Sequence, residues 1–586
     1  MTSAPQRHSV LFLSSVSMLL AGGITMVAWG LVQLISLITN LAFYQRWSFH
    51  EVSPANHGLG LLVVMVPVIG AVIIGFMARY GSKAIRGHGI PEAMEQILTN
   101  RSRIPARITV LKPLSAAISI GTGGPFGAEG PIIATGGALG SLVGQIFSVT
   151  VTERKTLLAA GAAAGMTAIF GSPVSAVLLA IELLLFEFSA RSIIPVALAC
   201  ATASALRLQC FGPEAIFAMP EMPVLTTGQL LFFVPLGAIV GVAAAGVSRT
   251  VYWVEDQFEK LPIHWMWWPA IGAVAVGGIG YLAPRTLGVG YNNIQDLVSA
   301  ALPLSVVAWL CGMKLISWLI ALGSGTSGGT LAPLLTIGAG LGSLLAYAAG
   351  SIGVEIPAGV AAAVGMAAMF AGASRALLAS VVFAFETTQQ PQVLPALLAG
   401  ATAAYLVAHL VSRHSIMTEK ITRRGFAVPH SYMPDPLQNL RVGDVMSDDF
   451  HTLSDRLSVA ELSSLIGSHD PLVSRRQAYL LLNEQGRLSG IVTRGDLVRC
   501  GNPSLTVLEA GGQNLRVAQA AEPLQHALTR MLQHNIGRLP VVDANEPDRV
   551  VGYLGRAEIL AAPALAEAEV NEAGWIEQWS ARRKAV

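Results

Sequence analysis

The amino-acid sequence predicts an all-α polytopic membrane domain that contains an internal repeat, followed by a smaller α/β tail. The first observation is composition, because 53% of the 586 residues are hydrophobic and only 12% are charged. A soluble protein of this length is rarely so apolar. The second observation is a pair of matching glycine-rich segments, 121–144 and 323–346. The third is the rise in charged residues after Ser412, which indicates a soluble part.

The internal repeat has a constant offset of 202 residues. Within the two glycine-rich segments, Pro131 corresponds to Pro333, Gly136 to Gly338 and Gly140 to Gly342. Before the segments, Lys112 corresponds to Lys314 by the same offset. Glycine- and proline-interrupted hydrophobic segments at corresponding places in two halves indicate a transporter-type site near the middle of the membrane. The clearest mismatch is Glu129 against Leu331. The two halves therefore share a scaffold and differ in chemistry.

Glu129 lies in a glycine-rich interruption between apolar segments. An ionisable side chain in a bilayer costs several kcal/mol unless it faces a partner or a watery cavity. Irregular backbone at that depth is tolerated where it lines such a cavity. We therefore expect Glu129 to be functional, the alternative being a glutamate in an ordinary exposed loop.

The membrane-spanning runs begin with an apolar stretch from residue 10 to about 43, which we expect to be a retained helix rather than a signal peptide. The later runs are 59–77, 157–185, 230–247, 268–282, 306–322, 361–385 and 394–411. Several of these are shorter than a full membrane crossing. We therefore expect tilted or discontinuous helices.

The stretch GHGIPEA, residues 87–93, lies between the second run and a basic loop at 101–107. Proline is tolerated in the first turn of a helix, and an acidic residue such as Glu92 is favourable there. A helix that begins at membrane depth directs free N–H groups at whatever fills the cavity. The basic loop is expected on the cytoplasmic side.

The tail alternates short β-rich runs with helical ones. The β-rich runs are 478–483 and 490–498, then 538–543 and 550–560. They predict a second duplication, with a period of about 60 residues and two small βαβ units. A charged stretch at 413–425 and a proline-containing linker at 428–436 precede them.

Four motifs now carry a family resemblance. GHGIPEA, GAEGP, GSGTSGGTLAP and GMAAMFAGASRALLASVVFAFETT occur in this order and resemble the signatures of the CLC chloride channel and transporter family. The tail resembles a pair of CBS regulatory modules. The resemblance implies a homodimer, with two inverted-topology halves in each subunit. It also implies a CLC transmembrane domain at 1–430, CBS modules at 438–500 and 504–566, and a C-terminal tail at 567–586.

By the same resemblance, Glu129 matches the family's gating glutamate, whose carboxylate can occupy an anion site and leave it when protonated. Backbone amides and helix dipoles bind an anion weakly enough for it to leave. The residues expected along the anion path are His88, Gly89, Ile90, Ala128, Gly130, Thr330, Leu331 and Met417.

Several of these positions depart from the family pattern. His88 replaces a serine and Met417 replaces a tyrosine, so both hydroxyls that normally touch the central anion are missing. Ala128 replaces an arginine and Leu331 a phenylalanine. His88 is either a direct anion ligand or a structural histidine that bonds a neighbouring carbonyl.

Exchangers of the family carry a second, inner glutamate that relays protons. Here that position is Leu183, preceded by Glu182 and followed after four residues by Glu187. Glu187 is either a substitute relay or a solvated residue at the cytoplasmic end of the helix. An apolar side chain cannot carry a proton, so the sequence favours a passive chloride channel, voltage-gated as in the family and gated by Glu129. The alternative is a proton-coupled anion antiporter.

In the tail, GIVTRGD resembles the nucleotide-binding turn of CBS modules, with Thr493 and Asp496 as the contacting residues. The second copy has Gly555 and Glu558 instead. We expect one weak adenine-nucleotide site, or else a structural pair. The expected partners are chloride or another small anion, membrane lipid and a second copy of the chain. We expect no nucleic acid partner, metal, other cofactor or enzymatic activity. The chain is expected in the inner or plasma membrane, with its tail cytoplasmic.

Overall fold

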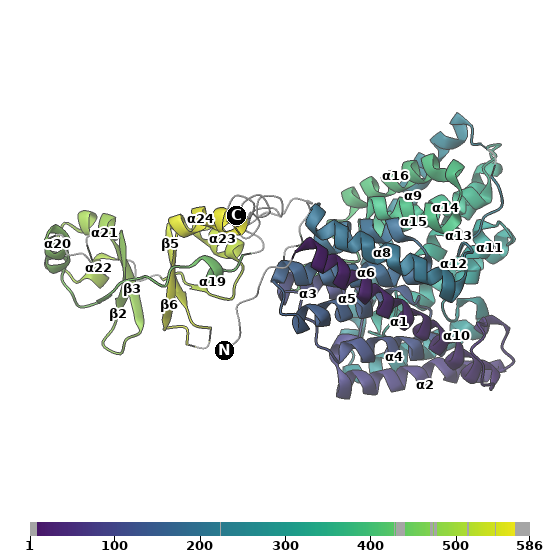
Figure 1. Cartoon of the computed structure of the whole chain (residues 1–586), viewed down its shortest axis with the longest axis horizontal. Coiled ribbons are helices and arrows are strands. Elements are labelled where there is room, and N and C mark those ends of the chain that lie inside the picture. The colour runs from purple at the N-terminus through teal and green to yellow at the C-terminus, as the bar shows by residue number, and fades with distance from the viewer. Residues whose placement is uncertain are drawn as a thin grey trace, which may run out of the picture. The chain divides into compact units, whose positions relative to one another are not determined.

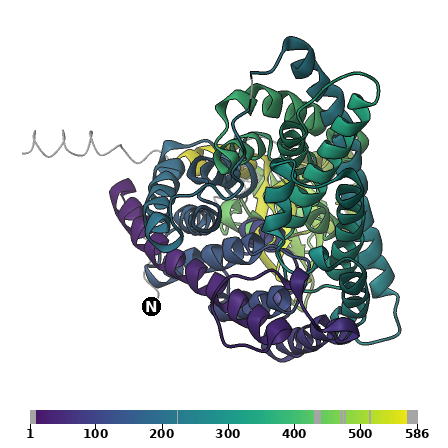
Figure 2. The ribbon, with the colours of Figure 1, turned by 90° about the vertical axis from the view of Figure 1, so that its right-hand side faces the viewer.

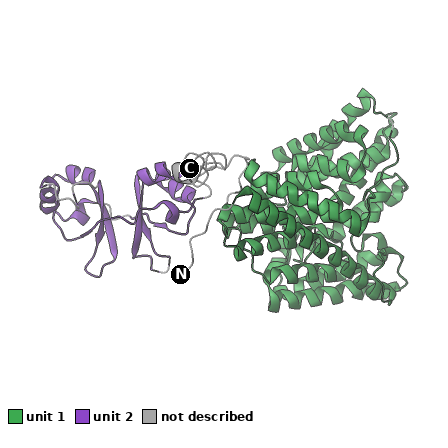
Figure 3. Cartoon of the chain, in the orientation of Figure 1, with its two compact units in different colours: residues 1–433 green, residues 434–586 purple. Residues whose placement is uncertain are grey.

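The structure, a computed structural model, describes residues 9–222, 224–426, 428, 440–468, 473, 477–511, 515–544 and 546–568. Within this range the chain forms two compact units, 1–433 and 434–586 (Figure 3). Apart from Val428, the predicted linker at 428–436 lies outside the described residues, and so do residues 569–586.

The first unit is helical (Figures 1 and 2). Its first half contains α1 (Val10–Tyr44), α2 (Met65–Phe76), α3 (Ile90–Thr99), α4 (Ile108–Gly121), α5 (Glu129–Ile146), α6 (Val151–Phe170), α7 (Pro173–Leu179) and α8 (Ala190–Phe211). Its second half contains α9 (Thr227–Glu259), α10 (Trp268–Leu282), α11 (Tyr291–Val298), α12 (Leu304–Gly323), α13 (Leu331–Gly350), α14 (Ala358–Ser374), α15 (Leu377–Thr388) and α16 (Leu394–Val411). A short helix, α17 (Glu419–Arg423), follows.

The two halves pack in the same way. Helix α5 lies against α6 as α13 lies against α14, and α1 lies against α8 as α9 lies against α16. Within the described residues, seven helical segments are long and apolar enough to cross a membrane, and four shorter apolar segments accompany them. This mixture of long and short helices confirms the expected discontinuity.

Two of the predicted apolar runs are each two helices. The run 157–185 breaks after α6, where Gly171 has a φ of +62° and Pro173 begins α7. A left-handed glycine ends a helix without steric cost, and proline fits the first turn of the next one. The run 361–385 breaks in the same way at Arg375, with a φ of +67°. The sequence analysis missed α8, because polar residues and two arginines, Arg191 and Arg207, interrupt its hydrophobic pattern.

The second unit contains two similar three-stranded sheets. The first contains β1 (Thr452–Ser454), β2 (Ala478–Leu482) and β3 (Leu488–Thr493), with α20 (Val459–Gly467) between β1 and β2 and α21 (Arg494–Cys500) after β3. The second contains β4 (Ala518–Gln519), β5 (Arg538–Val542) and β6 (Val550–Gly555), with α23 (Leu524–Gln533) between β4 and β5 and α24 (Arg556–Ala568) after β6. Short helices α19 (Val442–Val445) and α22 (Val507–Ala510) complete the unit.

In each sheet the first two strands are parallel and the third is antiparallel. Even the irregularity in the register recurs, at Leu481/Leu482 in one sheet and at Val541/Val542 in the other. Each sheet has its own apolar core, centred on Leu481 and Val541. The predicted duplication into βαβ units is therefore confirmed.

Candidate functional site

Glu129 is the first residue of α5, and its side chain is fully buried. Its Oε1 accepts a hydrogen bond of 2.5 Å from the backbone N–H of Ala332, the second residue of α13. Its Oε2 accepts a hydrogen bond of 3.1 Å from the hydroxyl of Tyr291, the first residue of α11. Helix N-termini carry partial positive charge and free N–H groups, so this arrangement stabilises an anionic group.

The loops that precede α3, α5 and α13 meet through their backbones. Gly127 and Gly329 exchange hydrogen bonds of 3.3 and 3.1 Å, which joins the two halves directly. A Cβ atom on Gly130 would lie 2.2 Å from the carbonyl oxygen of His88 and 2.7 Å from the Cα of Gly329. Only glycine fits so close an approach. The glycine-rich repeats thus bring three helix starts to one place.

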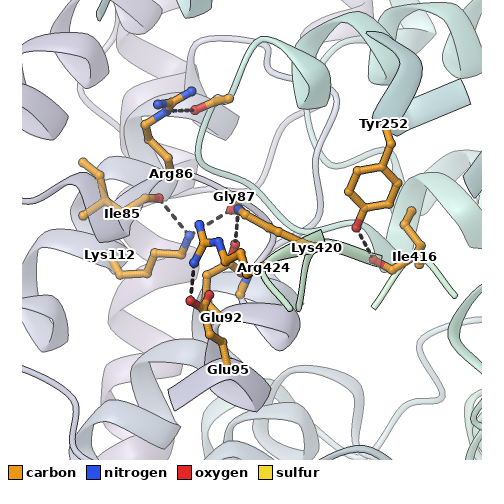
Figure 4. A network of polar contacts seen from close by, with 12 residues as sticks. Ile85, Arg86, Gly87, Glu92, Glu95, Lys112, Tyr252, Ile416, Lys420 and Arg424 are labelled. Carbon is orange, nitrogen blue, oxygen red and sulfur yellow. Dashed lines mark hydrogen bonds and ion pairs between the residues drawn. The ribbon is translucent and has the colours of Figure 1, made fainter. Parts of the chain in front are cut away.

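Two buried lysines hold the loops around this place. The Nζ of Lys112 donates to the carbonyls of Ile85 and Gly87 at 2.8 and 2.9 Å (Figure 4). At the repeat-related position, the Nζ of Lys314 donates to the carbonyls of Thr286 and Gly288, both at 3.0 Å. Each lysine therefore fastens the chain just before a short helix, α3 in one half and α11 in the other. Both place a positive charge inside the membrane unit.

The sequence analysis missed Tyr291. The signal was present, because GVGY at 288–291 follows GHGI at 87–90 by 201 residues, which aligns Tyr291 with Ile90. The ring of Tyr291 packs edge-on against Phe170 and Phe217, with centroid distances of 5.8 and 6.1 Å. These contacts fix the direction of its hydroxyl.

His88 is 5% exposed, and its Nδ1 atom has no hydrogen-bond partner among the described residues. Nδ1 makes no bond to a neighbouring carbonyl, so this atom does not provide the contact expected of a structural histidine. The next residue, Gly89, donates its N–H to Oε2 of Glu92 at 2.6 Å in a capping arrangement. The Gly89 amide is thus already satisfied, whereas the imidazole of His88 retains hydrogen-bonding capacity.

The remaining predicted path residues are buried: Ile90, Ala128, Gly130, Thr330, Leu331 and Met417. Thr330 and Leu331 begin α13, but the amide that contacts Glu129 belongs to the next residue, Ala332. The N–H of Met417 points to the hydroxyl oxygen of Ser415, at 3.2 Å. Within the described part of the chain, no hydrogen bond joins Met417 to Glu129.

The segment around Met417 is fastened to two helices (Figure 4). Tyr252 of α9 donates its hydroxyl to the carbonyl of Ile416 at 2.7 Å. Lys420 forms an ion pair of 3.2 Å with Glu92 of α3, and Arg424 pairs with Glu95 of the same helix. The chain that follows α16 is therefore bonded to the helix that begins beside His88.

Glu182, a candidate proton relay, caps a helix. Its two carboxylate oxygens accept the N–H groups of Leu378 and Ala379 in α15, both at 2.9 Å. The repeat-related Glu386 of α15 accepts the N–H groups of Val174 and Ser175 in α7, at 3.0 and 2.9 Å. The two helices thus cap one another, which gives Glu182 a structural role.

Glu187, the other relay candidate, is 9% exposed and is therefore not a solvated side chain. It forms an ion pair of 3.0 Å with Lys155 and accepts a short hydrogen bond from the hydroxyl of Ser192. Leu183 is 3% exposed and contributes to the apolar core.

In the tail, Thr493 and Asp496 form a capping box at the start of α21. The Thr493 hydroxyl donates to Oδ2 of Asp496 at 2.6 Å, and the Asp496 N–H donates to the hydroxyl oxygen at 3.2 Å. Partial burial alone would raise the pKa of Asp496, but the hydrogen bonds from Thr493 and Arg499 outweigh it and lower this pKa. At the second copy, Glu558 accepts the N–H of Gly555 at 2.9 Å. Both copies use the acidic residue as a cap.

Comparison with protein families identifies both units. The family described as "Voltage gated chloride channel" matches residues 69–409, and the family described as "CBS domain" matches residues 442–501 and 513–565. The first match covers more than half of the chain.

Individual relatives agree with this. The chain is 29% identical to the H(+)/Cl(-) exchange transporter ClcA of Vibrio campbellii, over 72% of this chain and 91% of that protein. It is 27% identical to a putative chloride channel protein, ClcB-like, of Ralstonia nicotianae, over 61% of this chain and 85% of that protein. Among solved structures, a slow cyanobacterial Cl-/H+ antiporter matches with a TM-score of 0.61 and 24% identity, over 72% of this chain and 99% of that one.

Proposed function

Because the chain belongs to the voltage-gated chloride channel family, we propose that it exchanges chloride or another small anion for protons across a membrane, with Glu129 as the gate. The predicted fold class, an all-α polytopic membrane protein with inverted-topology repeats plus an α/β CBS pair, is confirmed by the family matches and the similar structures.

One observation carries it: the buried carboxylate of Glu129 accepts the N–H of Ala332 at the start of α13. A carboxylate and a chloride ion have the same charge and compete for the same donors. Protonation neutralises the carboxyl group, weakens its bond to the amide and leaves the donors to an anion. Proton binding at Glu129 and anion binding at the helix start are thereby linked.

The choice between exchange and passive flow depends on further features. The ClcA exchange transporters are similar to this chain over most of their own length, which supports coupling. Glu187 supports it as well, because this buried carboxylate, four residues after Leu183, forms a polar group with its partners Lys155 and Ser192. We assign Glu187 rather than Glu182 as the inner proton acceptor, since Glu182 is committed to capping α15.

A passive chloride channel is the second candidate. Leu183 favours it, because a buried leucine interrupts the place where the family's exchangers carry a proton acceptor. In such a channel Glu129 opens the path on protonation, but no fixed number of protons crosses for each anion.

The decisive experiment uses the purified chain in liposomes, with a chloride gradient and no pH gradient. Chloride efflux and external pH are recorded together. Exchange predicts uphill proton movement at a fixed ratio to chloride, and Glu129→Gln is expected to preserve chloride flux while proton movement falls at least tenfold. Glu187→Gln is expected to retain chloride flux with reduced coupling.

The exposed carboxylate Glu214 provides the matched control, so Glu214→Gln should leave both fluxes unchanged. Chloride flux without proton movement in the unaltered protein would establish the passive channel instead. Equal proton movement before and after Glu129→Gln would remove Glu129 from the gate.

We extend the proposal to the rest of the molecule, taking His88, Ile90, Ala128, Gly130, Thr330, Leu331 and Met417 as the lining of the path. The chain acts as a homodimer in the inner or plasma membrane, with the CBS pair on the cytoplasmic side. Adenine nucleotide binds weakly at Thr493 and Asp496, which the CBS family match supports. Calorimetry of the full chain should detect heat at millimolar nucleotide, and its absence would leave the CBS pair a structural role.

A further inference from the structure

We propose that the hydroxyl of Tyr291 is a ligand of the transported anion and passes between the anion and the carboxylate of Glu129. This inference deepens the proposed function and rests on it. Tyr291 belongs neither to the expected gate, which is Glu129, nor to the backbone amides expected along the path.

Two hydrogen-bond donors, the Tyr291 hydroxyl and the Ala332 N–H, converge on the carboxylate of Glu129. The Tyr291 hydroxyl is 3.1 Å from Oε2 of Glu129, and the Ala332 nitrogen is 2.5 Å from Oε1. When the carboxylate leaves, both donors lose their acceptor. A donor left unsatisfied away from water costs free energy. An anion at the vacated position restores both hydrogen bonds at once.

The second step concerns the direction of the hydroxyl proton. The ring is held edge-on by Phe170 and Phe217. With the ring fixed, the O–H remains directed toward the position that Glu129 occupies. The donor is thus preorganised for an anionic acceptor.

The third step concerns the composition of the path. His88 and Met417, two residues expected along the path, carry no hydroxyl. Tyr291 supplies a hydroxyl from α11, which is the repeat counterpart of α3, the helix that follows His88. Tyr291 therefore offers the anion a side-chain hydroxyl that His88 and Met417 lack.

This ligand has a consequence for selectivity. A hydroxyl donor favours a small acceptor with concentrated charge over a large one, because the hydrogen bond is shorter and stronger. Removal of the hydroxyl should therefore weaken chloride binding more than iodide binding. A purely structural tyrosine would not change the ratio between two anions.

The test removes the competing carboxylate first. Initial rates of anion efflux from liposomes are measured against anion concentration for Glu129→Ala, and for the same variant that also carries Tyr291→Phe. The second substitution keeps the aromatic ring and removes only the oxygen. We expect the KM for chloride to rise about tenfold with kcat preserved within about twofold. The preference for chloride over iodide should fall by a similar factor.

Tyr44→Phe in the Glu129→Ala background is the matched control, because the Tyr44 hydroxyl bonds the carbonyl of Ser53 and makes no contact with Glu129. It should leave the KM and the anion ratio unchanged. A second measurement, independent of transport, is the stabilisation of the detergent-solubilised variants by chloride against thermal unfolding. Tyr291→Phe should shift this stabilisation to higher chloride concentrations.

The outcomes separate this inference from the proposed function. If Glu129→Ala conducts and binds chloride while Tyr291→Phe alters neither KM, anion ratio nor chloride stabilisation, the inference is overturned and the proposed function stands. If the unaltered protein and Glu129→Ala move no anion at all, both are overturned.

Discussion

Several buried or half-buried charged side chains of the membrane unit bind backbone groups. Glu129, Glu182 and Glu386 accept N–H groups at helix starts, and Lys112 and Lys314 donate to carbonyls of loops. A buried charge without partners is very costly, whereas several hydrogen bonds to fixed backbone dipoles offset much of that cost.

The imidazole of His88 retains hydrogen-bonding capacity, since its buried Nδ1 has no partner among the residues that the structure describes. We predict that His88→Ser changes the ratio of the efflux rate of chloride to that of larger anions at least twofold. The N–H of an imidazole lies farther from the backbone than the O–H of a serine, so the two side chains place their donors differently. The ratio is measured as relative initial efflux rates from liposomes. His409→Ser, at an exposed position of α16, is the control, and identical ratios for His88→Ser and the unaltered chain would make His88 structural.

The residues of the site could be predicted from the sequence to different extents. Glu129 was evident, because a charge in an apolar glycine-rich repeat is conspicuous. Lys112 and Lys314 were recognised only as repeat-related positions, without a role in the site. Tyr291 and Ala332 were not, since their contact with Glu129 joins residues about 160 to 200 positions apart. Such a contact depends on how the halves pack, and neither residue is unusual in its local sequence.

At the scale of helices, the reciprocal caps explain how two short helices begin inside the apolar unit. Helices α7 and α15 each start with N–H groups that have no partner within their own helix. Glu386 satisfies the first of them and Glu182 the second. The sequence showed these glutamates as repeat-related but could not show that each serves the helix of the other half.

We predict that Glu386→Ala and Glu182→Ala each destabilise the protein by roughly 1 kcal/mol, the usual cost of removing a helix cap. The thermal unfolding midpoint of the purified protein measures this effect. Glutamine at either position should be intermediate, because it keeps one carbonyl acceptor. Glu214→Ala serves as an exposed control, and equal midpoints for all the variants would show that the caps contribute no stability.

The order of helices and strands was more predictable than their exact ends. Hydrophobic runs located the spans, but a run does not reveal a break when apolar residues continue through it, as at Gly171 and Arg375. In the second unit the starts of β2, β3, β5 and β6 were predicted within two residues, because alternation and flanking turn residues define the start of a strand closely. The short strands β1 and β4 were not predicted, and the runs at β3 and β6 were predicted to end five residues too late.

At the scale of the whole molecule, the chain leaves α16 and passes beside the start of α3 before it continues to the second unit. Lys420 pairs with Glu92, which itself holds the N–H of Gly89 next to His88. Any displacement of this segment would therefore pull on the helix start that adjoins Glu129. The ion pair also neutralises Glu92, whose negative charge would otherwise repel an anion in the path.

We predict that Lys420→Met weakens the apparent affinity for chloride about fivefold, which corresponds to about 1 kcal/mol for an uncompensated, partly buried charge. The double variant Lys420→Met/Glu92→Gln has no unpaired carboxylate at position 92. Its apparent affinity for chloride should therefore lie within about twofold of that of the single variant Glu92→Gln. Chloride dependence of the initial efflux rate from liposomes is measured for both single variants and the double variant. Arg423→Met removes a pair with Asp256 in which both side chains are 40% or more exposed, and it should have little effect. If the double variant is as impaired as Lys420→Met, the ion pair acts through its geometry and the electrostatic explanation is wrong.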